Sequence, residues 1–182
     1  MHSRLLTNLI DPKSGQPLTL TSPVPGPSEI EQGTLVDSAG HSFPILHGIP
    51  RFVPASNYAS SFGYQWNKYA ELQLDSKNGT TFSKDRFFSI TEWPKADLLG
   101  ARVLDVGCGA GRVSEVVLRA GAHVVAVDLS QAVEACRKTF VLIQTLMWCR
   151  PLFMSSLFVL DRLISFTALA WCNIRQTQNN RY

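Results

Sequence analysis

The sequence has few features that would tie it to nucleic acid, metal or membrane. Its four cysteines show no Cys-x-x-Cys spacing, which argues against a zinc site and against a disulfide framework. The net charge of +3 comes from scattered Lys and Arg residues without a basic run, so no nucleic-acid partner is indicated. The longest uncharged run of the C-terminal part, residues 163–174, is shorter than the roughly 20 residues of a membrane span.

An apolar leader is also missing, because the opening stretch MHSRLLTNLIDPKSG reaches Asp11 and Lys13 before any apolar core of useful length. We therefore expect a cytoplasmic protein. Hydrophobic residues make up 45% of the chain and charged residues 17%, which is typical of globular proteins. The 182 residues suffice for one ordinary domain, or for a small domain and part of a larger one.

Residues 1–57 carry much of the proline. Short apolar pieces at 18–20 and 43–46 alternate with turn residues, which predicts a few short strands in a small β-rich module. Within it, the stretch SPVPGPSE, residues 22–29, is predicted to be a loop, because prolines this dense cannot donate to a sheet ladder.

Residues 58–99 form an aromatic-rich segment that joins this module to the next. Its aromatic residues at 58, 62, 64, 66 and 69 cannot share one helical face, so part of the segment is expected to be extended or to wrap another surface. These side chains fit an aromatic core. Alternatively they form a lid over a cofactor, with Tyr64 and Trp66 as the stacking candidates.

Residues 100–140 predict a strand, a glycine-rich loop, a helix and a second strand. ARVLDVG and HVVAVDLS both have the composition of buried parallel strands. Between them an apolar stripe follows helical spacing, and Gly121 stands where a left-handed helix cap belongs. That stripe consists of Val113, Val116, Val117 and Ala120.

The loop is suited to a ligand that contains a nucleoside and an anionic part. Gly107, Gly109 and Gly111 let the backbone turn sharply and approach a ligand without a Cβ in the way. The loop opens onto a helix N-terminus, which favours a negatively charged group. Asp128 ends the second strand, where a carboxylate can accept the hydroxyl protons of a ribose.

Dinucleotide and nucleoside triphosphate ligands fit the loop poorly. The dinucleotide fingerprint needs a third glycine where this chain has Arg112, and no Gly-Lys-Ser/Thr sequence forms a P-loop. Asp105, directly before the loop, would repel a pyrophosphate and favours a ligand with a cationic amino group. S-adenosylmethionine combines an ammonium, a carboxylate, a sulfonium and a ribose.

VLDVGCGAGR followed by VVAVDLS resembles the first two motifs of class I S-adenosylmethionine-dependent methyltransferases. The resemblance implies an α/β fold, the start of a Rossmann-like methyltransferase sheet that is incomplete here. It makes Asp105 and the loop glycines the methionine side of the site, Asp128 the ribose ligand and Leu129 a neighbour of the adenine. The implied cofactor-binding residues are Asp105, Gly107, Cys108, Gly109, Gly111, Asp128 and Leu129.

Methyl transfer needs mainly the alignment of donor and acceptor and the exclusion of water. The sequence does not identify a general base, and His123 is interpreted as a structural residue because it starts a buried strand away from the loop's mouth. The acceptor implied is a small molecule or a lipid-like compound. A non-catalytic S-adenosylmethionine-binding fragment, or pseudoenzyme, remains the alternative.

The N-terminal module has its own resemblance. LLTNLIDPKSGQPLTL and GTLVDSAGHSFPILHGIPRFV are similar to small zinc-ribbon-like proteins that serve as methyltransferase activators, and to segments fused to bacterial methyltransferases. The relatives usually place a Cys-Pro-x-Cys pair where this chain has residues 11–14, Asp-Pro-Lys-Ser. Without the thiolates a zinc site has lost its ligands, so we expect no metal.

Glycine disappears from the last part of the chain: all 12 glycines lie at or before Gly121. A parallel α/β sheet needs glycine at its turns and caps, and no valine-rich strand ending in an acid follows Phe140. Back-translation of residues 156–179 in a shifted frame permits a string that resembles the region after the cofactor acid in this methyltransferase family. We therefore hypothesise that residues 141–182 are an out-of-frame tail on a truncated methyltransferase. Such a chain would contribute two strands to a sheet that should have about six or seven.

Overall fold

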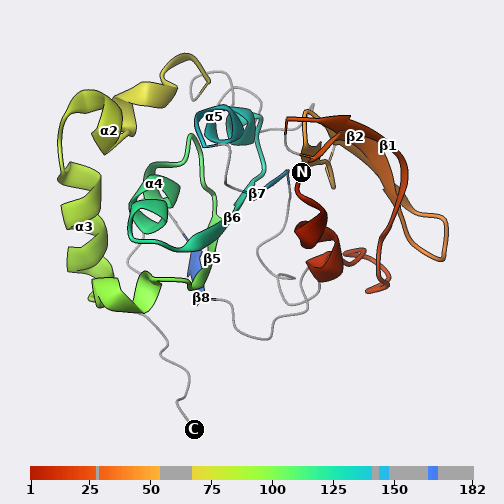
Figure 1. Ribbon diagram of the computed structural model, residues 1–182, viewed down its shortest axis with the longest axis horizontal. Coiled ribbons are helices and arrows are strands. Elements are labelled where there is room, and N and C mark those ends of the chain that lie inside the picture. Colours follow the sequence, from red (N-terminus) through yellow and green to blue (C-terminus); the bar gives the residue numbers. More distant parts are fainter. Residues whose placement is uncertain (28, 54–66, 141–143, 148–163, 168–182) are drawn as a thin grey trace, which may run out of the picture.

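The computed structural model describes residues 1–27, 29–53, 67–140, 144–147 and 164–167, and it contains two sheets (Figure 1). One is a four-stranded antiparallel sheet in the order β1-β2-β3-β4, and the other a four-stranded parallel sheet in the order β7-β6-β5-β8. The predicted fold class, a Rossmann-like α/β sheet that is incomplete and preceded by a small β-rich module, is confirmed.

The N-terminal module is a meander that follows a short 3-10 helix. Its elements are η1 (Ser3–Asn8), β1 (Thr19–Gly26), β2 (Glu29–Val36), β3 (Ser42–Leu46) and β4 (Ile49–Pro50). In β3 the side chains alternate, so that Phe43 and Ile45 are buried and their neighbours are exposed. This period of two buries one face of the module's sheet and leaves the other in solvent.

The proline-rich stretch is not the loop that its composition predicts. Ser22 to Gly26 belong to β1, and the pairing with β2 is irregular between Thr21 and Pro25. β1 lies at the edge of its sheet, where a missing N–H on one side leaves no ladder partner unsatisfied. The register shifts absorb the remaining prolines, and Ser22 adopts a left-handed backbone with φ of +49°.

The parallel sheet grows from the predicted strand–loop–helix–strand unit. Its first elements are β5 (Arg102–Val106), α4 (Arg112–Arg119), β6 (His123–Asp128) and α5 (Ala132–Thr139). The predicted apolar stripe of α4 packs inward, with Val116 and Val117 buried. Gly121 follows the helix with φ of +92°, and its N–H donates to the carbonyl of Leu118, as expected of a helix cap.

The segment after Phe140 contributes two further strands, so the expectation of only two strands is wrong. β7 (Gln144–Met147) pairs with β6, and β8 (Ile164–Thr167) pairs with β5 on its other side, both in parallel. Without them both edges of the β5–β6 pair would leave backbone groups without ladder partners, and almost any apolar strand can satisfy these groups. The resulting order, third-second-first-fourth, is that of the first part of a Rossmann sheet.

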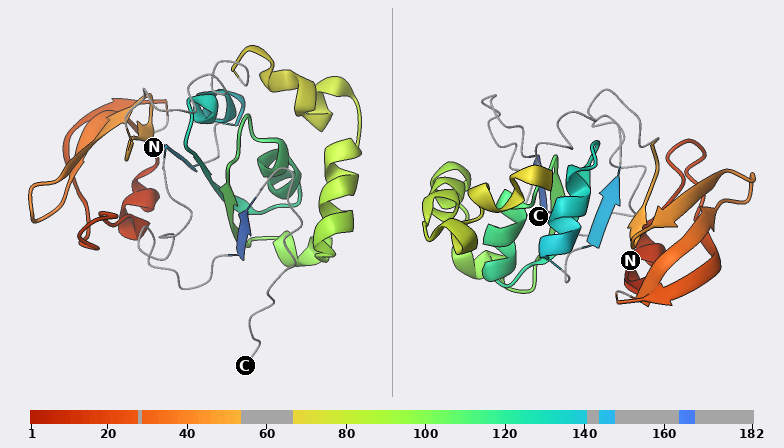
Figure 2. Two further views of the ribbon diagram at one scale, coloured as in Figure 1. Left: turned by 180° about the vertical axis from the view of Figure 1, so that it is seen from behind. Right: turned by 90° about the horizontal axis from the view of Figure 1, so that it is seen from above.

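The two faces of the parallel sheet are covered by different parts of the chain (Figures 1 and 2). Val103 and Val124 pack against α4 and α5 on one face. Leu104 and Val127 join the core of the N-terminal module on the other. A doubly wound sheet needs a layer on each face, and here the module supplies the second one.

Residues 67–99 form short helices outside α4 (Figure 2). They are η2 (Ala70–Gln73), α2 (Asp75–Asn78), α3 (Phe82–Thr91) and η3 (Lys95–Leu98). Phe87 of α3 is buried in the same core as Val116 and makes an edge-on contact with Trp93 at 5.8 Å. Phe87 of this segment therefore contributes to the core, whereas Tyr69, the one residue of the five aromatic positions that the structure describes, is 51% exposed. Among the described residues no helix is long and apolar enough to cross a membrane.

Candidate functional site

The glycine loop joins the carboxyl end of β5 to the first turn of α4. Gly107, Gly109 and Gly111 have φ values of +77°, +53° and +95°, a region that other residues rarely adopt. Gly107 is exposed, whereas Cys108, Gly109 and Gly111 are buried. The backbone conformation explains why glycine recurs at alternate positions of this loop.

Hydrogen bonds fasten the loop to the end of β6. The N–H groups of Gly107 and Cys108 both donate to the carbonyl oxygen of Val127, at 2.7 Å and 3.1 Å. The N–H of Gly109 donates to Oδ2 of Asp128 at 2.8 Å. The loop and the predicted ribose acid therefore form one hydrogen-bonded unit at the carboxyl edge of the sheet, where ligands of open α/β sheets bind.

Asp128 has a second set of donors that sequence reasoning missed. Its Oδ1 accepts hydrogen bonds from the N–H and the hydroxyl of Ser130, at 2.8 Å and 2.7 Å. The Asp-x-Ser spacing is typical of a turn in which a carboxylate caps its own backbone, and could have revealed this contact. The side chain is half-buried, as is Leu129 beside it.

Asp105 is fully buried at the end of β5, and its two oxygens differ. Oδ2 accepts a hydrogen bond from the Ser114 hydroxyl at 2.6 Å, whereas Oδ1 has no partner among the described residues. Burial raises the pKa of this carboxyl to about 6, against the opposing effect of hydrogen bonds from Ser114. A buried oxygen without a donor is costly, so we expect a donor from a bound water or ligand beside it.

Cys136 of α5 is a neighbour of the loop that the sequence does not reveal. Its thiol contacts that of Cys108, and this hydrogen bond together with burial raises the pKa of Cys108 well above its usual value. Both cysteines are free and buried. A thiol with a raised pKa is a poor nucleophile, so Cys108 serves to pack the loop.

Tyr64 and Trp66, the lid candidates, lie outside the described residues. Asn67, which follows Trp66 in the chain, donates from Nδ2 to the carbonyl of Gln131 at 2.9 Å, just beyond Asp128. His123 is exposed at the start of β6, at the opposite edge of the sheet from the loop.

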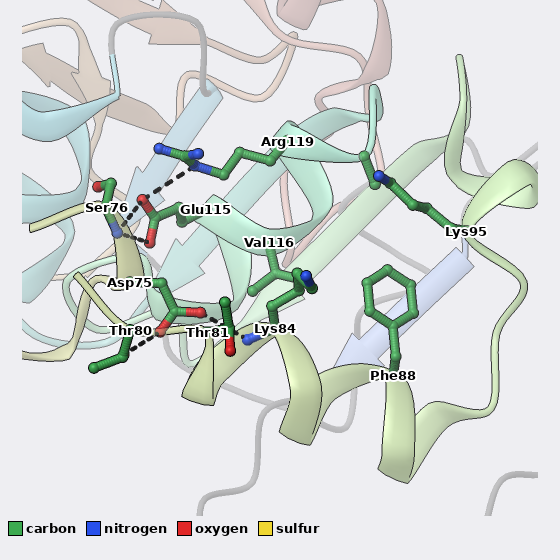
Figure 3. Close-up of a pocket in the computed structure, with 11 residues that line it drawn as sticks. Asp75, Ser76, Thr80, Thr81, Lys84, Phe88, Lys95, Glu115, Val116 and Arg119 are labelled. Atoms are coloured by element: carbon green, nitrogen blue, oxygen red, sulfur yellow. Dashed lines mark hydrogen bonds and ion pairs between the residues drawn. The ribbon is translucent and has the colours of Figure 1, made fainter. Parts of the chain in front are cut away.

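A pocket of about 210 Å³ lies between α2, α3 and α4 (Figure 3). Glu115 is buried there, accepts a hydrogen bond from the N–H of Ser76 and pairs with Arg119. None of the predicted cofactor residues lines this pocket. It is a gap between packed helices, separate from the glycine loop.

The N-terminal module holds a polar cluster that includes Asp11 and Ser14, the two positions where the expected zinc-ribbon pattern would have cysteines. Nδ1 of His41 lies 2.8 Å from Asp11 Oδ2 and 3.1 Å from Asp37 Oδ2, and Ser14 Oγ lies 2.7 Å from both oxygens. Both acids are buried. Asp11, Asp37 and His41 lie close enough together to hold a metal ion, so the expectation of no metal remains a prediction.

Protonated His41 is expected to supply the positive charge that balances Asp11 and Asp37 in this cluster. Hydrogen bonds to Asp37 and Asp11 raise the pKa of His41 above 6.5. Burial opposes ionisation of Asp37, but hydrogen bonds from Ser14 and His41 outweigh it and hold its pKa below 3.8. The stabilisation by protonated His41 is therefore complete below pH 6.5 and is lost as the pH rises through the raised pKa of His41 in the folded protein. The stabilisation by ionised Asp37 is complete above pH 3.8 and is lost as the pH falls through its lowered pKa.

We therefore expect the parent to lose stability at alkaline pH more steeply than His41→Gln in denaturant titrations. His123→Gln, which alters an exposed histidine, should follow the parent. Metal analysis of chelator-washed protein should find no zinc. One zinc per chain, or parallel pH profiles for the parent and His41→Gln, would contradict the prediction.

Comparisons with known proteins find similarity over the part of the chain that contains the loop. Residues 103–147 match the family described as "Methyltransferase domain", a range that runs from β5 to β7. The ubiquinone biosynthesis O-methyltransferase of Xylella fastidiosa (strain M23) is 63% identical over 35 residues, 19% of this chain and 14% of that protein. Its counterpart in Hahella chejuensis is 58% identical over 38 residues, 21% of this chain and 16% of that protein.

Solved structures of methyltransferases are also similar to part of the chain. Phosphoethanolamine N-methyltransferase 1 of Haemonchus contortus, in complex with S-adenosylhomocysteine, has a TM-score of 0.33 and 21% identity, and the match covers 49% of this chain and 21% of that one. For protein arginine methyltransferase 10 of Arabidopsis thaliana the TM-score is 0.36 with 19% identity, covering 50% and 28%. The family match covers β5 to β7, less than half of the chain, and shows that this part is similar to a methyltransferase domain.

Proposed function

We propose that the glycine loop and the ends of β5 and β6 bind S-adenosylmethionine for methyl transfer to a small-molecule or lipid-like acceptor in the cytoplasm. The observation that carries this proposal is the buried Oδ1 of Asp105, which has no partner among the described residues. An ammonium group would satisfy it and would neutralise the carboxylate. The ubiquinone O-methyltransferases among the relatives support a small acceptor.

In this proposal each part of the site contacts one part of the cofactor. Asp105 faces the ammonium, and the loop of Gly107, Cys108, Gly109 and Gly111 lies along the methionine chain. Asp128 accepts hydrogen bonds from the ribose hydroxyls, on the carboxylate lone pairs that the hydrogen bonds from Gly109 and Ser130 do not use. Leu129 packs against the adenine. Tyr64 and Trp66 are the proposed lid, which the contact of Asn67 with Gln131 supports.

The chain's own contribution to the chemistry is binding, orientation and exclusion of water. S-adenosylmethionine, when bound, would supply a methyl group that its sulfonium already activates. No residue of the described part is assigned as a general base, and we propose that none is needed in the loop. We propose no metal for either part of the chain.

We further propose that residues 141–182 are an out-of-frame tail and that the chain is a truncated methyltransferase, inactive alone. Among the described residues the parallel sheet has four strands, fewer than the about six or seven that we expect of such domains. The gene sequence decides the point: stop codons in the shifted frame, or a reading that does not continue the fold, would dismiss it. The alternative function is that of a non-catalytic S-adenosylmethionine-binding fragment.

Calorimetric titration with S-adenosylmethionine tests the binding step, and transfer of a labelled methyl group to a cell extract tests the catalytic one. Binding without transfer selects the truncated or non-catalytic protein. Binding with transfer shows that the chain is an active methyltransferase and contradicts the proposal that it is inactive alone. Absence of binding to the folded chain would reject the cofactor assignment.

Asp128→Ala should weaken binding of S-adenosylmethionine by about 1–3 kcal/mol, because two ribose hydroxyls lose their shared charged acceptor. The same change frees the N–H of Gly109, so the loop also loses an anchor. Asp97→Ala removes an exposed carboxyl away from the loop and serves as the matched control. Equal affinities for both variants and the parent in calorimetry would exclude Asp128 from the site.

A further inference from the structure

The side chain that donates a hydrogen bond to the fully buried carboxyl of Asp105, within the described part of the chain, is that of Ser114. Its hydroxyl lies 2.6 Å from Oδ2, while Oδ1 has no partner among the described residues. Both side chains are 0% exposed, so water does not compete for this bond. The hydroxyl therefore decides how the carboxyl is turned and which oxygen remains available.

The position of Ser114 explains the contact. It lies in the first turn of α4, on the side of the helix that faces β5, between the apolar residues of the buried stripe. A buried hydroxyl on this face needs an acceptor. Asp105, at the end of the neighbouring strand, is that acceptor.

Charges around Asp105 favour its neutral form, and Ser114 opposes them. Burial is the largest effect on the pKa of Asp105 and raises it, the hydroxyl and N–H of Ser114 lower it, and the negative charge of Asp128 raises it, which gives a net value of about 6. The thiol of Cys108, in the loop, interacts with the charge of Asp105, and the thiol of Cys136, on α5, contacts that of Cys108. Without Ser114 the carboxyl would stay protonated at higher pH.

We propose that Ser114 is a positioning residue that binds Oδ2 of Asp105 and so keeps its Oδ1 available for the ammonium group of the ligand. The inference rests on the proposed function, because it assigns the methionine end of S-adenosylmethionine to this oxygen. It predicts that Ser114 matters for a ligand with an amino group and not for one that lacks it.

Two ligands separate these cases. S-adenosylmethionine carries the ammonium, whereas 5′-methylthioadenosine keeps the adenosine and lacks the amino-acid end. Ser114→Ala should bind S-adenosylmethionine about tenfold more weakly than the parent, the effect of one lost hydrogen bond to a charged group, and 5′-methylthioadenosine equally well. Ser114→Thr keeps a hydroxyl and should restore most of the affinity. Ser42→Ala, at an exposed position of β3, is the control.

The pH profile gives a readout that a purely structural role would not change. Affinity of the parent for S-adenosylmethionine should fall as the pH drops through the Asp105 pKa of about 6, since a protonated carboxyl does not attract an ammonium. In Ser114→Ala this midpoint should move to higher pH. If the alanine variant does not fold, Ser114→Cys, with a similar volume and a weaker donor, should show the same shift.

The outcomes distinguish the two levels of the proposal. If the parent binds S-adenosylmethionine and the Ser114 variants match it in affinity and midpoint, the inference on Ser114 is wrong and the proposed function stands. A loss of affinity for both ligands with an unchanged midpoint also overturns it, since that is the signature of a structural defect. If the folded parent binds neither ligand, the proposed function fails and the inference fails with it.

Discussion

Replacing Gly111 with alanine should destabilise the protein by several kcal/mol and remove cofactor binding. The residue has φ of +95°, which costs about 1–2 kcal/mol for any residue with a Cβ. That Cβ would also lie 2.7 Å from Cε2 of Phe140 and 2.9 Å from Sγ of Cys136. Overpacking of this kind adds about 1–3 kcal/mol. Denaturant unfolding and titration with S-adenosylmethionine measure the two effects.

Gly100→Ala is the matched control, because Gly100 has φ of +72° and a Cβ at this position would meet no atom within 4 Å. The variant should lose only the backbone contribution and keep its affinity for the ligand. Equal losses of unfolding free energy for Gly111→Ala and Gly100→Ala would mean that Phe140 and Cys136 shift to accommodate the new Cβ without loss of stability. A larger loss for Gly111→Ala would mean that the protein's own packing requires glycine there, whatever the ligand needs.

Leu104→Ala is expected to cost about 2–5 kcal/mol, the usual penalty for emptying a buried leucine site. Leu104 is 1% exposed and lies in the cluster that joins β5 to Met1, Leu5 and Leu9 of the N-terminal module. The loss should appear in a single unfolding transition that includes both sheets, because they share this core.

Leu72→Ala provides the contrast, since Leu72 is 68% exposed and its removal should change stability by no more than about 0.5 kcal/mol. If Leu104→Ala is equally mild, or if the two sheets unfold separately in the parent, the module is not the second layer of the parallel sheet. Arg51 strengthens the same connection, because its guanidinium donates to Glu134 of α5 at 2.7 Å.

Local patterns in the sequence were sufficient for the central unit. The apolar stripe of α4, the cap at Gly121 and the acid that ends β6 all depend on neighbours close in the chain, and each lies where its pattern places it. The β-rich character of the module was visible for the same reason. These features follow from short-range spacing in the sequence.

Patterns that depend on a strand's place in its sheet were misread. The prolines of β1 are tolerated because β1 is an edge strand, and the sequence does not say which strands lie at edges. Likewise, β7 and β8 form because β6 and β5 each offer an open edge, although their own sequence lacks the expected valine-rich pattern.

The sequence by itself determined the strand–loop–helix–strand unit, its glycines and the acids at its strand ends, because these follow from residue spacing and backbone freedom. Only the tertiary structure decided their partners. It brought Ser114 to Asp105, joined Asp11 to Asp37 and His41, and laid the N-terminal module on Leu104. Such contacts join residues far apart in the chain, and they depend on which faces pack together, a property that no local spacing encodes.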